Sequence, residues 1–111
     1  MVRLTVTLVA SHSGARQLLD AFRSLMVPTR LEPGCIGCLV WEELEDDSTL
    51  HYAEEWATEA DMRRRVESNR FTSLLAIMEA AAERPQVQFD FVTISRGLDY
   101  VAEVRRHASS P

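Results

Sequence analysis

The sequence is short of several residue types, and each shortage excludes a class of protein. Its 111 residues include only two cysteines, four glycines and four prolines. Two cysteines cannot form the disulfide framework of a small secreted domain, and a 46% hydrophobic content is too high for a disordered chain. No apolar run approaches the roughly 18 residues of a membrane-spanning helix, and the N-terminus lacks the layout of a signal peptide. We therefore expect a folded cytoplasmic domain.

Positive charge is also scarce. Twelve Lys and Arg residues stand against 17 Asp and Glu residues, which gives a formal net charge of −5. Proteins that bind nucleic acid or anionic membranes usually carry a basic surface, so neither is expected as a partner. The length fits one domain, which we assign to residues 1–106, and residues 107–111 are expected to form a flexible tail.

Hydrophobic periodicity predicts eight elements. Alternation of apolar and polar residues, with period two, indicates strands, and apolar residues spaced three and four apart indicate amphipathic helices. Ser11 to Gly14 form a turn and a possible helix cap, Pro28 is expected to end the first helix, and residues 45–48 to form the bend of a hairpin. The expected strands are 2–10, 36–44, 49–57 and 87–93, and the expected helices are 15–26, 59–67, 71–82 and 97–106.

This order corresponds to a split β-α-β arrangement of the α+β class, with a four-stranded antiparallel sheet and helices on one face. The hairpin strands carry apolar residues on both sides. Leu39 and Trp41 alternate with Ile36, Val40 and Leu44. Because helices cover only one face, the sequence predicts a two-fold dimer in which two sheets pack face to face.

Cys35 and Cys38 have the C-x-x-C spacing of redox pairs and zinc ligands. On a regular strand, positions i and i+3 point to opposite faces and lie about 10 Å apart, too far for a disulfide. The three histidines have no ligand spacing, so no metal site is expected. Thiol redox activity of the two cysteines stays as a hypothesis to be tested.

Other charged residues are weak candidates for chemistry. His51 could act as a general base, but the sequence places no obvious carboxylate to orient it. Arg63, Arg64 and Arg65, with Arg70 nearby, form the only basic cluster in the sequence, and such a cluster could hold an anionic ligand. The alternative is a solvated, ion-paired helix face, because Glu59, Asp61 and Glu67 lie at pairing distances on the same helix.

The segment 50–56 carries the strongest signal. Tyr52, Glu54 and Trp56 share one face of a strand. A carboxylate between two large aromatic side chains must be paired, hydrogen-bonded or near a cavity. Periodicity permits a small-molecule pocket and ordinary core packing equally well.

Four segments give the chain a resemblance to the antibiotic biosynthesis monooxygenase (ABM) superfamily, from residue 2 to about residue 94. They are Leu31-Glu32-Pro33-Gly34-Cys35, Glu54-Glu55-Trp56, Thr58-Glu59-Ala60-Asp61-Met62 and Ser68-Asn69-Arg70-Phe71. The resemblance implies a ferredoxin-like β-α-β-β-α-β fold in a dimeric α/β-barrel. Some members oxidise polycyclic aromatics or quinols with O₂ and without metal or flavin, whereas others degrade haem, isomerise sugars or have no known activity.

Carried over residue by residue, the resemblance assigns Trp56 to the pocket wall. Tyr52 and Met62 stand where an aromatic-oxidising member has asparagine and tyrosine. Arg65 replaces a histidine of many relatives, and Leu75 stands where haem degradation needs a histidine, which argues against that activity.

We therefore expect a cofactor-independent monooxygenase-like protein that binds an aromatic or quinol-like molecule. Tyr52 and Arg65 are the expected catalytic residues, Arg65 as a donor to an anionic oxygen, and Trp56, Met62 and Phe71 the pocket residues. The alternative is a non-catalytic dimeric module for ligand binding or interaction on the same scaffold.

Overall fold

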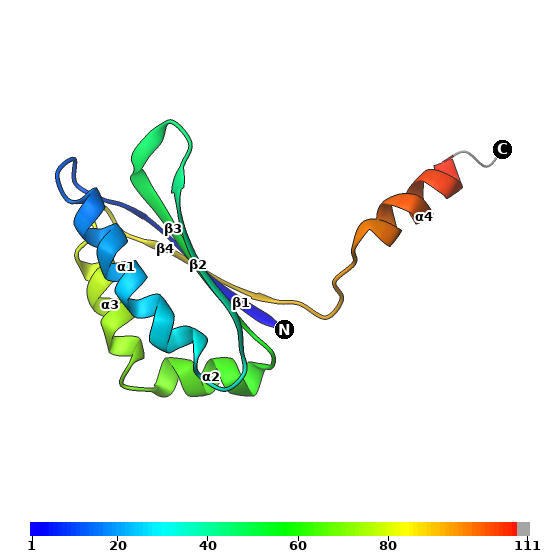
Figure 1. Ribbon diagram of the computed structural model, residues 1–111, viewed down its shortest axis with the longest axis horizontal. Helices are drawn as coiled ribbons and strands as arrows, with labels where there is room; N and C mark the ends of the chain where they lie inside the picture. Colours follow the sequence, from blue (N-terminus) through cyan, green and yellow to red (C-terminus); the bar gives the residue numbers. More distant parts are fainter. Residues whose placement is uncertain (109–111) are drawn as a thin grey trace.

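The computed structural model describes residues 1–108 and has the expected α+β architecture (Figure 1). Four strands form one antiparallel sheet in the order β2-β3-β1-β4. Helices α1, α2 and α3 cover one face of this sheet. The elements are β1 (Val2–Val9), α1 (Ala15–Arg30), β2 (Cys35–Glu43), β3 (Asp46–Trp56), α2 (Glu59–Glu67), α3 (Phe71–Glu79), β4 (Gln86–Phe91) and α4 (Leu98–Ala108).

Strand β1 lies at the centre of the core. Its alternate residues Val2, Leu4, Val6 and Leu8 are buried beneath the helices. Their neighbours on the same face include Tyr52 on β3, which pairs with Val6. The alternation of apolar and polar residues in the sequence predicted a strand with one buried face, and the structure confirms it.

Helix α1 continues past Pro28 to Arg30, so the prediction that Pro28 ends it was wrong. The proline lies in the last turn, where a missing N–H removes only one helical hydrogen bond. The Thr29 hydroxyl donates to the carbonyl of Leu25 at 2.8 Å and holds this turn. At the other end, the turn before Gly14 is present, but no side chain caps the helix.

The hairpin turn is tighter than predicted. Strand β2 reaches Glu43 and β3 begins at Asp46, so Leu44 and Glu45 form the connection instead of residues 45–48. Glu45 adopts a left-handed conformation with φ of 69°. A positive φ at the second of the two connecting residues lets the chain reverse over this short distance.

A β-bulge changes the first residues of β2. Cys35 pairs with Trp56 and Gly37 with Glu55, so that Ile36 is the extra residue between them. Cys38 pairs with Glu54, on the same face as Trp56. The prediction that the two cysteines point to opposite faces was therefore wrong, because the bulge breaks the period of two.

The turn before β2 depends on Gly34. Its φ is +86°, its carbonyl accepts the N–H of Ala57 at 2.8 Å, and a Cβ added there would collide with the Asp61 carboxylate. We expect Gly34→Ala to lower the free energy of unfolding by about 1–3 kcal/mol, measured by urea denaturation. Gly37→Ala is the control, since a Cβ at Gly37 meets nothing within 4 Å. Equal stability of the two variants would contradict this role.

The short helices follow the sequence signals in part. Thr58 caps α2 by accepting the N–H of Asp61 at 3.1 Å, as its position predicts. Helix α3, by contrast, ends at Glu79, because the N–H of Ala82 bonds to the carbonyl of Val9 at 2.8 Å. We expected an apolar stripe that included Phe71, Leu74, Leu75 and Ala82. Phe71 and Leu74 are buried together with Ile77, whereas Leu75 and Ala82 are exposed.

Helix α4 projects away from the rest of the chain (Figure 1). It runs from Leu98 to Ala108, so two residues of the expected tail are helical, and residues 109–111 lie outside the described residues. The radius of gyration is 17.1 Å, whereas a compact chain of this length would have about 13 Å. Among residues 1–108, no helix is long and apolar enough to cross a membrane.

Candidate functional site

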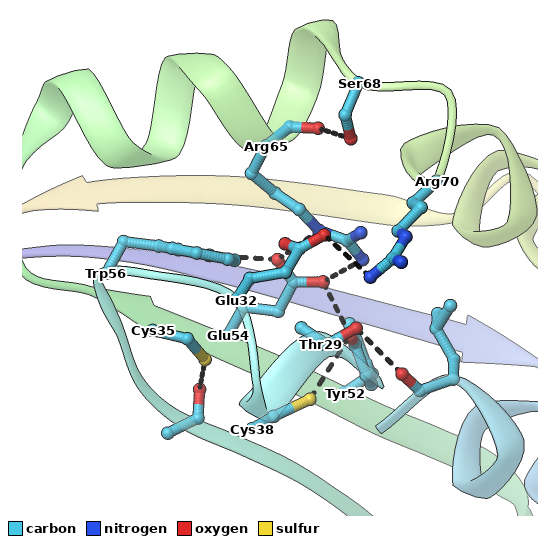
Figure 2. A network of polar contacts seen from close by, with 12 residues as sticks. Thr29, Glu32, Cys35, Cys38, Tyr52, Glu54, Trp56, Arg65, Ser68 and Arg70 are labelled. Carbon is cyan, nitrogen blue, oxygen red and sulfur yellow. Dashed lines mark hydrogen bonds and ion pairs between the residues drawn. The ribbon is translucent and has the colours of Figure 1, made fainter. Parts of the chain in front are cut away.

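The carboxylate of Glu54 is the centre of a buried polar network (Figure 2). Its side chain is completely buried and accepts hydrogen bonds from three residues. The Tyr52 hydroxyl donates at 2.5 Å and the Trp56 indole Nε1–H at 3.0 Å. Arg65 donates from Nε at 3.0 Å and from Nη2 at 2.8 Å. The carboxylate flagged by the sequence is therefore fully paired.

Arg65 reaches this carboxylate from the last turn of α2. Its side chain is only 1% exposed, and its guanidinium stacks over the Phe71 ring at 5.5 Å. Burial by itself would lower the pKa of Arg65, but the hydrogen bonds and charge of Glu54 outweigh it and raise that pKa. Arg65 is thus a permanent cation whose charge is balanced inside the core.

The network continues from Tyr52 to Cys38. The Cys38 thiol donates to the Tyr52 hydroxyl at 3.3 Å, and the Tyr52 ring stacks on Phe22 with 4.9 Å between centroids. Burial, followed by the charge of Glu54, raises the pKa of Tyr52 far above its ordinary value. Tyr52 therefore keeps its proton near neutral pH and acts as a donor to Glu54.

A cavity of about 610 Å³ opens between α1 and α3, and Arg65 contributes to its lining. This volume is in the range of small-molecule sites. Arg70, whose side chain is 66% exposed, lies on the same cavity and is 3.7 Å from Glu32. The lining residues are Ala21, Ser24, Leu25, Pro28, Thr29, Arg65, Arg70, Ser73, Ala76 and Ile77.

The structure brings four of the five predicted site residues together. Tyr52, Trp56 and Arg65 meet at Glu54, and Phe71 packs against Arg65. Arg65 alone among these four lines the cavity. Met62 is buried in the same hydrophobic core, 3% exposed, and lines a separate groove beside β4 instead of the cavity.

Sequence reasoning missed most of the cavity wall. Ser24, Thr29 and Ser73 come from two helices whose separation no local pattern encodes. Two signals in the sequence pointed to Arg70, namely its place in the motif that carried the family resemblance and its nearness to the basic cluster of residues 63–65. Glu54 was identifiable, because an acidic residue between two aromatic residues on a strand needs a partner.

His51 has the carboxylate partner that the sequence did not reveal. Its Nε2 lies 2.5 Å from Glu43 and its Nδ1 lies 3.0 Å from the Thr7 hydroxyl. Trp41 stacks on the imidazole with 5.2 Å between ring centroids. The expectation that nothing orients His51 was wrong, because the hairpin register places Glu43 close to it. These residues lie on the sheet face away from the helices.

The cysteines and acidic residues form no further centre within the described part of the chain. Cys35 and Cys38 are free thiols, and burial raises the pKa of Cys38 to about 11. No three His, Cys, Asp or Glu residues among residues 1–108 are grouped to hold a metal ion.

Known proteins share this architecture. A crystal structure of an antibiotic biosynthesis monooxygenase matches with a TM-score of 0.72 and 19% identity, over 85% of this chain and 100% of that one. Rv0793 from Mycobacterium tuberculosis matches with a TM-score of 0.75 and 14% identity, over 86% of this chain and 98% of that one. A conserved protein from Methanosarcina mazei Go1 matches with a TM-score of 0.73 and 22% identity, over 80% of this chain and 89% of that one. At these identities the likeness establishes the fold.

The sequence itself matches a family model. Among curated proteins none matches the sequence. The model for antibiotic biosynthesis monooxygenases matches residues 1–76, which span both the hairpin and the Glu54–Arg65 pair. The chain belongs to the antibiotic biosynthesis monooxygenase family.

Proposed function

We propose that this chain is a cytoplasmic, cofactor-independent monooxygenase that binds an aromatic or quinol-like molecule in the cavity between α1 and α3. The observation that carries the proposal is the position of Arg65. It joins a largely apolar cavity to a fully buried carboxylate that fixes its guanidinium. An apolar space with a few oriented polar groups suits a flat, electron-rich substrate.

Arg65 is the residue proposed to contact the reacting molecule. A guanidinium has five N–H donors, and Glu54 accepts two of them. The remaining donors are available to an anionic oxygen of a phenolate or enolate in the cavity. Because Glu54 balances its charge, Arg65 stabilises that oxygen through oriented hydrogen bonds, while Arg70 at the rim adds positive charge.

The chemistry proposed is oxidation of the bound anion by O₂. The substrate supplies the electrons, one oxygen atom enters it and the other leaves as water, so that SH₂ + O₂ gives SO + H₂O without another reductant. The protein excludes water and holds the anion. Tyr52 is proposed as the residue that positions Glu54, because its hydroxyl donates to that carboxylate and not into the cavity.

Filling the cavity tests the proposal. Ala76 is exposed on α3 and lines the cavity, whereas Thr72 is exposed on the same helix and does not line it. We expect Ala76→Trp to weaken binding of a hydroquinone panel more than about tenfold, since the ring would occupy the ligand space. Thr72→Trp should bind as the unchanged chain does. Binding is followed by fluorescence and turnover by oxygen uptake, and equal binding by both variants would contradict the site.

A non-catalytic ligand-binding protein is the second candidate, and one observation favours it. The only ionisable side chains among the lining residues are Arg65 and Arg70, and arginine cannot act as a base near neutral pH. Binding that Ala76→Trp abolishes, without oxygen uptake above the buffer background, would support this reading over the enzyme.

The proposal includes a homodimer with the two sheets face to face. On the face away from the helices, Leu39 and Trp41 are 58% and 42% exposed, and they adjoin Ala53 on the neighbouring strand. A second copy would cover this apolar strip. We expect a dimer in sedimentation velocity, and we expect Leu39→Arg to shift it toward monomer. A monomer in the unchanged chain would overturn this assembly.

A further inference from the structure

Helix α4 carries an apolar stripe that none of residues 1–108 covers. Leu98, Val101, Val104 and Ala108 recur at spacings of three and four, which places them on one face of the helix. All four are exposed, Leu98 to 82%. A helix of 11 residues is marginal in water unless such a face is packed.

An uncovered apolar surface of matching length lies along β4. Val87, Phe89 and Phe91 occupy the helix-side face of this edge strand and are all partly exposed. Two shallow grooves follow this face, and we call them together the β4 trough. It is lined by Met62, Val66, Leu75, Met78, Val87, Phe89 and Phe91, with Glu59, Arg63, Glu67, Glu79, Arg84 and Pro85 at its rim.

We propose that α4 of one copy docks in the β4 trough of a second copy, and that the second copy reciprocates. From Val87 to Phe91 the strand spans about 13 Å, and from Leu98 to Ala108 the helix spans about 15 Å. The last turn of α4 carries Arg105, Arg106 and His107, and the trough rim carries one more acidic than basic side chain, Glu59, Glu67 and Glu79 beside Arg63 and Arg84. This inference rests on the self-association proposed above and assigns it a second contact.

A second copy fits better than the same chain. Val92 still pairs with the strand edge, since its N–H bonds to the carbonyl of Met1 at 2.8 Å and its carbonyl accepts the amino group of Met1 at 3.2 Å. The chain is thus held in the direction of β4, which carries it beyond the end of the sheet. From there α4 projects away from the sheet and from α2 and α3 (Figure 1).

Chemical crosslinking identifies the occupant of the trough. Val66 lines the trough and Val101 lies on the α4 stripe, and both are exposed enough to replace without loss of folding. In the variant Val66→Cys/Val101→Cys, we expect a short bismaleimide to convert most of the chain to a covalent dimer on a denaturing gel. Val66→Cys/Glu103→Cys is the matched control, because position 103 lies on the opposite face of the helix, and the unchanged chain reports the background from Cys35 and Cys38.

Sedimentation velocity on the same samples separates the two proposals. A dimer whose crosslink joins two chains supports the exchange of α4. A dimer that gives no crosslink overturns the exchange of α4, and so does a dimer whose crosslink lies within one chain, at monomer mass on the gel. Both results are compatible with the face-to-face dimer. A monomer overturns both. As a second measurement, Val101→Asp is expected to raise the dimer dissociation constant about tenfold or more, and an unchanged constant would contradict the inference.

Discussion

Arg65→Met is expected to lower the free energy of unfolding by about 3–5 kcal/mol, because it leaves a buried carboxylate without its cation. Glu54 is completely buried, and Arg65 is the only cation among the described residues that bonds to it. Methionine keeps most of the apolar stem of the side chain and removes the guanidinium, so the loss of stability reports mainly the broken charge pair. Urea denaturation monitored by the fluorescence of the two tryptophans measures it.

Arg63→Met is the matched control for this prediction. Arg63 precedes Arg65 on α2, but its side chain is 72% exposed, and we expect a change within about 0.5 kcal/mol. The double variant Glu54→Gln/Arg65→Met should recover part of the loss, since no uncompensated charge remains. A loss below about 1 kcal/mol for Arg65→Met would show that water reaches the pair and would remove the basis for a fixed guanidinium at the cavity.

The thiol of Cys38 is expected to react with a thiol reagent at pH 8 about 100-fold more slowly than a cysteine of the unfolded chain. Burial is the main cause that raises its pKa to about 11, from an ordinary value of 9.0. The thiolate is the reactive form, so its population falls in proportion. The rate in buffer is compared with the rate in urea, in a Cys35→Ser background that leaves one thiol to follow.

The same pKa fixes the sign of a pH dependence. The folded chain holds the thiol proton up to about pH 11, whereas the unfolded chain releases it near pH 9. The buried, protonated Cys38 thiol therefore contributes to the free energy of unfolding in full below pH 9, and this contribution is lost as the pH rises toward 11. The pKa of Tyr52 is also raised by burial, and it acts in the same direction. Fast reaction of Cys38 at pH 8 would contradict this account and would revive the thiol redox hypothesis.

The sequence predicted those parts of the fold in which one face of an element is buried. Strand β1 alternates because the helices cover one side of it, and the Thr58 cap depends only on residues three positions apart. The end of α3 was not predictable in this way. It depends on the bond from Ala82 to Val9, which joins residues 73 positions apart in the chain.

The sequence predicted the charged residues of the candidate site, but it did not predict the residues that line the cavity. Glu54 needed a partner, and the family resemblance drew attention to Arg65. Which residues line the cavity depends on how far apart α1 and α3 pack, and side-chain patterns do not encode that distance. The partner of His51 was hidden for a related reason, since Glu43 is placed by a turn two residues shorter than predicted.

The bulge at Ile36 decides which side chain of β2 lies in the core opposite Trp56. Side chains alternate along a strand, so a regular strand over residues 35–38 would place Ile36 opposite Trp56 and turn Cys35 to the face away from the helices. Gly34 would then no longer reach Ala57. We expect chains of this family that have a regular strand at these four positions to have a different residue type at the position of Cys35, because that side chain would no longer face the helices.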